Sequence, residues 1–214
     1  MALTMYFTRT PRYEGIGIKD IKLIESYLNW QHEIEVGGKY ASESFEKWCG
    51  HSETELPEKN VIEYFKTFYS KKEIYIEGIG RGKRFGICEQ MTRLVKTNQI
   101  FRWFIVNLMD GNASNEYYEV TKEQLNALYK ICSDVKDSFT FLGKNKHTNE
   151  CEYLVDKAIA SKLLPLMEEV GYFFGPVEYN ILYSEQIIKA MDAIKNIIST
   201  TDFDNQTIYF NASW

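Results

Sequence analysis

The chain has 214 residues, of which 44% are apolar and 26% are charged, and its formal net charge is −5 at pH 7. This composition supports a globular protein with a sizeable core and excludes a disordered chain. The acidic balance argues against a surface for duplex nucleic acid, because such a surface needs a positive field over a broad face.

Length and residue spacing predict one domain that spans residues 1–214. The sequence contains no internal repeat and no low-complexity linker. Its four cysteines lie far apart and form no metal-ligand pattern with histidine, so we expect free thiols and neither a metal nor another cofactor. No apolar run approaches the length of a membrane span, and we expect a cytoplasmic protein with no membrane partner.

The N-terminal part of the chain predicts a short strand at residues 5–8 and an amphipathic helix at residues 18–30. In that helix, apolar residues recur on one face at helical spacing: Ile21, Ile24 and Leu28. A short helix around residues 45–48 is expected to begin at Ser42 as its cap and to end at Gly50.

The middle of the chain contains the longest uninterrupted helix signal, residues 89–109, in which apolar residues recur at helical spacing. We predict one core helix there. Alternating apolar and polar side chains at residues 73–79 predict a half-buried strand of a small antiparallel sheet. A basic, glycine-rich segment, residues 78–86, joins this strand to the helix.

The C-terminal part begins with Thr121 followed by Gln124, a spacing that predicts a capping box and therefore the start of a helix. Further helices are expected at residues 150–164 and 178–198. The β-forming residues 207–214 predict a final edge strand. Together these elements predict an α+β fold that is dominated by helices and has a small antiparallel sheet.

The glycine-rich segment 78–86 is the first candidate for a ligand site. Its glycines would let backbone N–H groups approach an anion, while Arg81, Lys83 and Arg84 add cationic donors just ahead of the predicted helix. A phosphate could bind there. The alternative is a twisted hairpin with solvated basic side chains, and the sequence leaves both interpretations open.

The second candidate is the polar set of the predicted helix, Lys96, Asn98 and Arg102. Asn98 and Arg102 share one helix face, whereas Lys96 points to a different side. Polar side chains of this kind can bind a small ligand. They can equally be ordinary surface donors that pair with neighbouring acidic residues.

Aromatic residues form the third candidate, since rings beside Arg and Lys hold nucleobases by stacking. The candidate rings are Trp103, Tyr172, Phe173, Tyr179 and Tyr183. Residues 171–183 are expected to include a short buried strand, and Glu178 could present a carboxylate beside Tyr179 and Tyr183. The alternative is that these rings belong to the core.

The sequence gives little support for an enzyme. Its histidines, His32, His51 and His147, lie near no serine or cysteine nucleophile in a recognisable arrangement. No pair of acidic residues suggests an acid and base couple. We therefore expect binding without turnover.

The segment 96–107 has the sequence KTNQIFRWFIVN, and the segment 163–183 has the sequence LLPLMEEVGYFFGPVEYNILY. They resemble two motifs, W-R-K-A-N-x-I-H-x-W-F-V and G-F-F-F-G-x-x-E-Y-x-x-x-Y, of a family of small uncharacterised phage-encoded proteins. The matching residues are Lys96, Asn98, Ile100, Trp103 and Phe104 in the first motif and Gly171, Phe173, Phe174, Gly175, Glu178, Tyr179 and Tyr183 in the second.

This resemblance implies a phage accessory protein that acts in the cytoplasm of the host cell, and it implies no particular activity. Three of the departures of the chain from these motifs matter. Leu94, Val95 and Phe101 stand where the family has Trp, Arg and His, so no role of those groups is carried over.

Together these observations favour a phage accessory protein that sequesters a nucleotide-like small molecule, a host immune signal, without turning it over. The alternative is an acidic protein that inhibits a host factor through its surface. Whether the chain forms a homo-oligomer stays open. Two distant polar and aromatic segments suggest one converging pocket, so we predict that Asn98 and Trp103 approach residues 171–183.

Overall fold

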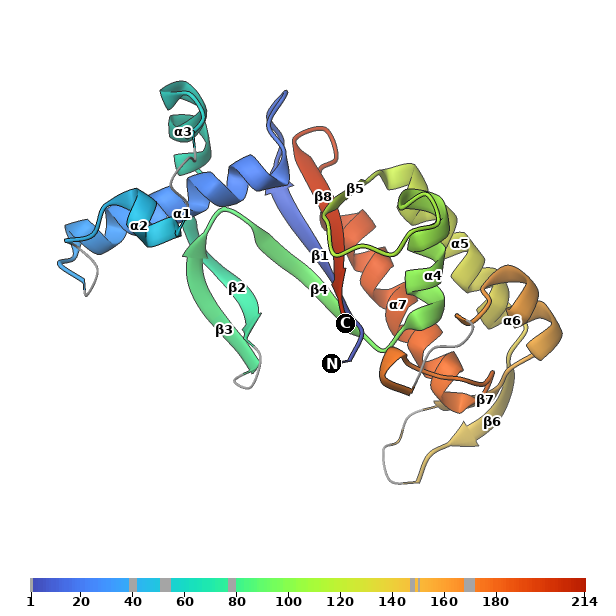
Figure 1. Cartoon of the computed structure of the whole chain (residues 1–214). Coiled ribbons are helices and arrows are strands. Elements are labelled where there is room, and N and C mark those ends of the chain that lie inside the picture. The colour runs from blue at the N-terminus through green and yellow to red at the C-terminus, as the bar shows by residue number, and fades with distance from the viewer. Residues whose placement is uncertain are drawn as a thin grey trace. The chain divides into compact units, whose positions relative to one another are not determined.

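The computed structural model describes residues 2–38, 42–50, 55–76, 80–146, 149, 151–167 and 172–214 (Figure 1). Within these residues the fold is α+β with antiparallel sheets, as the sequence predicts. Its elements are, in chain order, β1 (Thr4–Pro11), α1 (Ile18–Glu35), α2 (Phe45–Cys49), α3 (Lys59–Lys66), β2 (Ser70–Ile76), β3 (Gly80–Gly86), β4 (Glu89–Val95), α4 (Asn98–Leu108), β5 (Tyr118–Val120), α5 (Lys122–Asp137), β6 (Thr140–Lys144), β7 (Cys151–Leu154), α6 (Lys157–Leu163), the 3₁₀-helix η1 (Tyr172–Phe174), α7 (Ile181–Thr200) and β8 (Gln206–Ser213).

Four strands are hydrogen-bonded into one sheet in the order β4, β1, β8, β5. β2 and β3 pair in an antiparallel hairpin, and β6 and β7 pair in another. The predicted strand 73–79 is confirmed over its first part, which belongs to β2. Residues 77–79 lie outside the part of the chain that the structure describes.

Contacts divide the chain into two compact units. The first unit consists of Met1–Phe7, Met91–Thr201 and Phe210–Trp214, and the second consists of Thr8–Gln90 and Asp202–Tyr209. β1, β4 and β8 each contribute residues to both units. That the chain is one folding domain stays a prediction.

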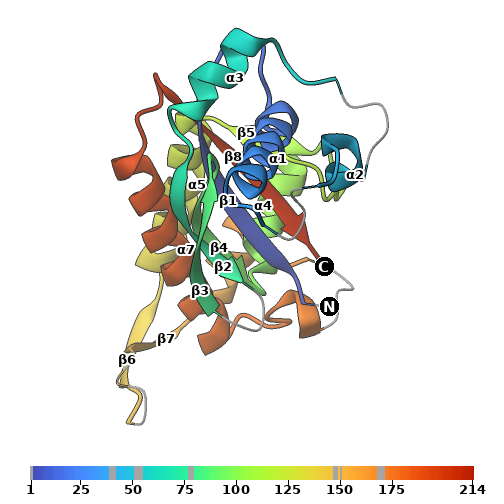
Figure 2. The same cartoon turned by 90° about the vertical axis from the view of Figure 1, so that its left-hand side faces the viewer.

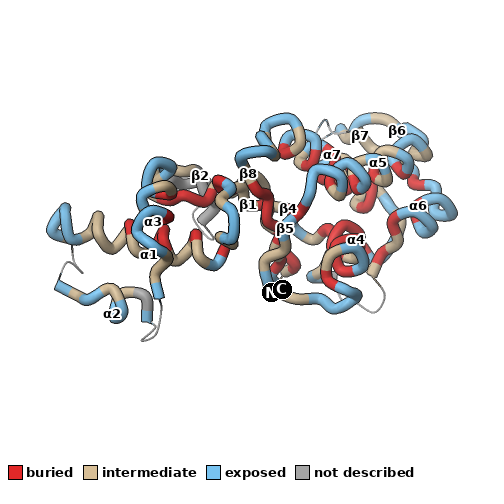
Figure 3. Tube along the Cα trace, turned by 90° about the horizontal axis from the view of Figure 1, so that it is seen from above, coloured by how far each residue is buried: buried red, intermediate tan, exposed pale blue. Residues whose placement is uncertain are grey.

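Three phenylalanines form the centre of the core of the first unit. Phe104 of α4 stacks on Phe210 of β8 with ring centroids 3.9 Å apart, and Phe7 of β1 meets both rings edge-on. α5 packs against α7 in the same unit (Figures 1 and 2). Figure 3 shows that buried residues concentrate along these helices, whereas β6 and α6 are largely exposed and β7 is mostly half-buried.

The second unit is built around α1, which packs against α2, α3 and β3. The predicted apolar face of α1 is confirmed, because Ile21, Ile24 and Leu28 are all buried. Gly50 ends α2 in the left-handed conformation, as predicted. The cap of α2 is Ser44, which corrects the prediction of Ser42.

The predicted helix 89–109 is wrong in its first third. Residues Glu89–Val95 form β4, beside β1 in the sheet, and only Asn98–Leu108 is helical. The residues of β4 are mostly good helix formers, but pairing with β1 satisfies their backbone. The ion pair between Arg9 and Glu89, with N and O atoms 2.7 Å apart, adds to this pairing within the second unit.

Three further predictions are corrected by the structure. The predicted helix 150–164 begins with β7, and its helical part, α6, starts only after Asp156, which caps it through the N–H groups of Ala158 and Ile159. The C-terminal strand β8 lies inside the sheet between β1 and β5, so it is not an edge strand. Residues Tyr172–Phe174 form a 3₁₀-helix instead of a buried strand.

Candidate functional site

The candidate site lies in the first unit, where β4 ends and α4 begins. Lys96 connects the two elements with φ of 59°, a left-handed conformation that is uncommon for residues other than glycine. Its backbone is held by the hydrogen bond from Lys96 N to Leu3 O, 2.9 Å long. Left-handed residues of this kind concentrate at binding sites, because the surrounding structure must compensate for their strain.

The segment that follows η1 packs directly on this connection. Gly175 has φ of 132°, and a Cβ atom at this position would overlap the carbonyl oxygen of Lys96. The next residue, Pro176, accepts a hydrogen bond of 2.9 Å from Asn98 Nδ2. Asn98 therefore lies against residues 171–183 as predicted, although Gly171 itself is outside the described residues.

The start of α4 is polar and buried. Thr97, Asn98 and Gln99 are only 2%, 0% and 0% exposed, respectively. Among the residues that the structure describes, no acceptor lies within hydrogen-bonding distance of the backbone N–H of Asn98 or Gln99. The side-chain oxygens Thr97 Oγ1 and Gln99 Oε1 also lack a partner there. Buried polar groups are nearly always satisfied, so this cluster has capacity for a further polar group.

One wall of the cluster is supplied by α7. Gln99 Nε2 donates to Gln186 Oε1 at 3.4 Å, and Gln186 is itself buried. The cluster thus combines amide donors, a hydroxyl group and amide oxygens with the positive end of the α4 dipole. Such a set can bind an anionic or strongly polar group, and none of these side chains is a nucleophile paired with a base.

Three further predicted ligand residues instead hold the chain segment 164–166. Arg102 Nη1 donates to Leu166 O at 2.8 Å, and Tyr179 Oη accepts from Leu166 N at 3.2 Å. Tyr183 Oη donates to Leu164 O at 2.8 Å. Burial raises the pKa of Tyr183 above its ordinary value, so this phenol stays neutral and remains a donor. The structure therefore brings these residues together with Asn98 around one segment.

Two of the predicted stacking rings, Trp103 and Tyr183, are buried. Trp103 is 9% exposed and contacts Phe104 edge-on, and Tyr183 is fully buried. That Trp103 approaches residues 171–183 stays a prediction. Glu178 is exposed. Phe173 is exposed, whereas its neighbour Phe174 is half-buried, and no sequence signal distinguishes the two rings.

The basic glycine-rich segment belongs to the second unit. Its residues Gly80–Gly86 form strand β3 of a hairpin and lead into another strand, β4, so the segment does not precede a helix as predicted. The backbones of Arg81 and Lys83 lie in β3, whereas their side chains are outside what the structure describes. A ligand role of Arg81 and Lys83 therefore stays a prediction.

The amide groups at the end of this segment already bind an internal anion. The N–H groups of Ile87 and Cys88 donate to Glu25 Oε2 at 2.7 and 2.9 Å. Arg84 Nη2 lies 3.3 Å from Glu25 Oε1, and Gly86 packs against the same carboxylate. The Glu25 carboxylate thus binds one of the three predicted basic residues, Arg84, and the two amide groups that follow the segment.

Among the described residues, no group of three or more His, Cys, Asp or Glu residues is arranged to hold a metal ion. In the same part of the chain, no helix is both long and apolar enough to cross a membrane. The cysteines Cys88, Cys132 and Cys151 are free thiols. Comparison of the chain with models of protein families, with curated proteins and with solved structures found no match.

Proposed function

We propose that this chain binds a phosphate-bearing, nucleotide-like small molecule at the start of α4 and releases it unchanged. The observation that supports the proposal is the buried, polar start of this helix. Two backbone N–H groups, of Asn98 and Gln99, and the hydroxyl of Thr97 lack partners among the described residues. A helix N-terminus with open amide groups favours an anion through both hydrogen bonds and the helix dipole.

Charged side chains beside this helix end support an anionic ligand. Lys96 immediately precedes the cap residue Thr97. Arg102 lies one turn after Asn98 and is fixed by its bond to Leu166 O, which uses only one of its five N–H donors. Hydrogen bonds from such cations to a phosphate are stronger than those between neutral groups.

The resemblance to phage-encoded proteins supports the biological part of the proposal. The ligand is then a signal of host immunity, and the protein lowers its free concentration in the host cytoplasm by sequestering it. This role needs tight binding and slow release, and it needs no chemical step.

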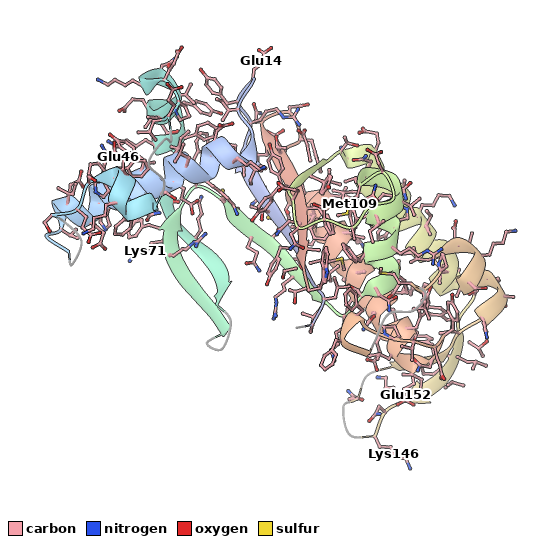
Figure 4. All side chains as sticks on the ribbon, viewed as in Figure 1. Glu14, Glu46, Lys71, Met109, Lys146 and Glu152 are labelled. Carbon is pink, nitrogen blue, oxygen red and sulfur yellow. The ribbon has the colours of Figure 1, made fainter. Side chains whose placement is uncertain are left out.

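A second candidate function is inhibition of a host protein by direct binding. The β6–β7 hairpin favours it, because Phe141, Leu142 and Leu154 are 57%, 55% and 58% exposed on a projecting pair of strands. Figure 4 shows Lys146 and Glu152 on the same hairpin. Exposed apolar groups rimmed by charged residues are typical of protein interfaces.

Calorimetry against a panel of linear and cyclic nucleotides tests the proposal. A charge-assisted hydrogen bond contributes about 1.5–3 kcal/mol, so we expect Lys96→Ala to weaken binding roughly ten- to a hundredfold, since ~1.4 kcal/mol is a factor of ten. Lys162→Ala is the matched control, because Lys162 is an exposed lysine of α6 in the same unit. The control should bind like the unmodified protein.

The recovered ligand distinguishes binding from catalysis. After denaturation of the complex, chromatography should return the nucleotide unchanged. A new product would make the protein an enzyme, and absence of binding across the whole panel would favour inhibition of a protein.

A further inference from the structure

We infer that Phe173 is the surface on which the ring of the ligand stacks, and that the ligand therefore belongs to the nucleotides rather than to the sugar phosphates. This inference rests on the proposed function at the start of α4. It assigns the stacking role to a residue other than Trp103, Tyr179 and Tyr183, whose rings or hydroxyl groups serve the interior of the first unit.

The first argument is the unusual position of the Phe173 ring. It is 64% exposed, although the backbone around it is closely held. Phe173 O accepts a hydrogen bond of 3.1 Å from Leu3 N, and Gly175 packs on the Lys96 carbonyl group. The neighbouring ring of Phe174 lies 6.5 Å from that of Trp214. A fixed backbone with an exposed ring loses little conformational entropy when a flat ligand binds.

The second argument is that Phe173 and the residue before the cap of α4 bond to the same residue, Leu3. Leu3 N bonds to Phe173 O, and Leu3 O accepts from Lys96 N, so both residues lie beside the same residue of the chain. Lys96 immediately precedes the cap of α4. The backbone of Phe173 therefore lies close to the connection that leads into α4.

The third argument concerns the chemistry of the exposed surface. Val177 is 60% exposed and follows Phe173 by one short turn of chain. Between them, Gly175 and Pro176 are buried against Lys96 and Asn98. An apolar surface beside a cation matches a flat, hydrophobic base linked to a phosphate. A base stacked on an aromatic ring contributes about 1–3 kcal/mol, and a sugar phosphate lacks this contribution.

A single exposed phenylalanine is common on protein surfaces and by itself indicates nothing. Phe141 is an example in the same unit, since it is 57% exposed on the β6–β7 hairpin. Phe173 differs because its neighbours bond to the polar start of α4. Phe141 therefore provides the matched control for the test.

The test compares adenosine 5′-monophosphate, 3′,5′-cyclic adenosine monophosphate and ribose 5-phosphate by calorimetry. The unmodified protein should bind at least one of the two nucleotides more tightly than ribose 5-phosphate. Phe173→Ala should weaken binding of that nucleotide roughly five- to a hundredfold, from the free energy of one stacked base, and should leave binding of ribose 5-phosphate unchanged. Phe173→Trp should restore nucleotide binding, and Phe141→Ala should leave it unaffected.

The outcomes separate this inference from the proposed function. If nucleotides and ribose 5-phosphate bind equally, or if Phe173→Ala binds nucleotides normally, the stacking role is wrong while phosphate binding stands. If none of the three probes binds to the unmodified protein, the proposed function itself fails. Circular dichroism of each variant verifies that the exposed substitution leaves the fold intact.

Discussion

Glu25 is an internal anion of the second unit that lies beside the basic, glycine-rich segment. Its carboxylate accepts the N–H groups of Ile87 and Cys88 and lies beside Arg84 and Gly86. Basic, glycine-rich sequence indicates an affinity for anions. It cannot indicate that the anion is a side chain more than fifty positions earlier in the same chain.

Replacement of Glu25 should reduce stability strongly. Glu25→Ala leaves two buried N–H donors without an acceptor, and each costs about 1–3 kcal/mol. We expect the free energy of unfolding, measured by urea denaturation, to fall by about 2–6 kcal/mol on this basis. Glu25→Gln should lose less stability, because its amide oxygen can still accept a hydrogen bond.

Glu35→Ala is the control for Glu25, since Glu35 is an exposed residue at the end of the same helix. Its effect should be within about 0.5 kcal/mol. Equal effects of Glu25→Ala and Glu35→Ala would show that the buried carboxylate contributes nothing to stability.

At the scale of elements, the connection between β4 and α4 depends on the close approach of Gly175. A methyl group there would meet the Lys96 carbonyl oxygen, a backbone atom that cannot rotate away. The connection also contains Asn98, whose side chain bonds to Pro176 O and Met167 N. Gly175, Pro176 and Met167, which are distant from α4 in the sequence, are thus held at its start by close packing and by hydrogen bonds of the Asn98 side chain.

Gly175→Ala should therefore lower the free energy of unfolding more than the same substitution at another glycine with positive φ. Gly143→Ala is the matched control, because Gly143 has φ of 140° but open space around its Cα atom. Overpacking costs about 1–3 kcal/mol, and we expect the loss at Gly175 to exceed the loss at Gly143 by about that amount in urea denaturation. Similar losses of stability in the two variants would mean that the segment around Gly175 moves away from Lys96 without a cost in free energy.

The elements that the sequence predicts correctly are those specified by neighbouring residues. Thr121 and Gln124 form the expected capping box, with hydrogen bonds of 2.9 and 3.2 Å. The apolar faces of α1 and α7 follow from helical spacing. In contrast, residues 89–95 have helical propensity and form a strand, since the partner that decides their structure is β1, far away in the sequence.

The candidate site was predictable to a similar degree. The two motifs indicated that Asn98 meets residues 171–183, which the bond to Pro176 confirms. The sequence could not show that the partners of Arg102, Tyr179 and Tyr183 are backbone groups of residues 164–166. A side chain that binds a carbonyl group and one that binds a ligand have the same residue type.

At the scale of the whole molecule, two buried cysteines report on the two units separately. Cys88 belongs to the second unit and Cys132 to the first. Burial, together with Glu25 in the case of Cys88, raises the pKa of each thiol to about 12. Neither thiol should react with a thiol reagent at pH 8 while its unit is folded, because the thiolate is the reactive form.

This protection tests whether the chain is one folding domain. In a Cys49→Ser background, we expect Cys88 and Cys132 to become reactive at the same urea concentration, as one cooperative domain requires. Cys151 is partly exposed and should react without denaturant. Reaction of Cys88 at a urea concentration that still protects Cys132 would show that the two units unfold independently.

The position of β8 between β1 and β5 has a consequence for the synthesis of the protein on the ribosome. Arg12 N, at the end of β1, donates to Asn205 O at 2.9 Å. The end of β1 must therefore wait for a strand that is made almost two hundred residues later. Until then β1 has an open edge, which in nascent chains is a site for incorrect pairing. The sheet is thus expected to fold only after β8 has left the exit tunnel, and chaperones that shield open strand edges should increase its yield.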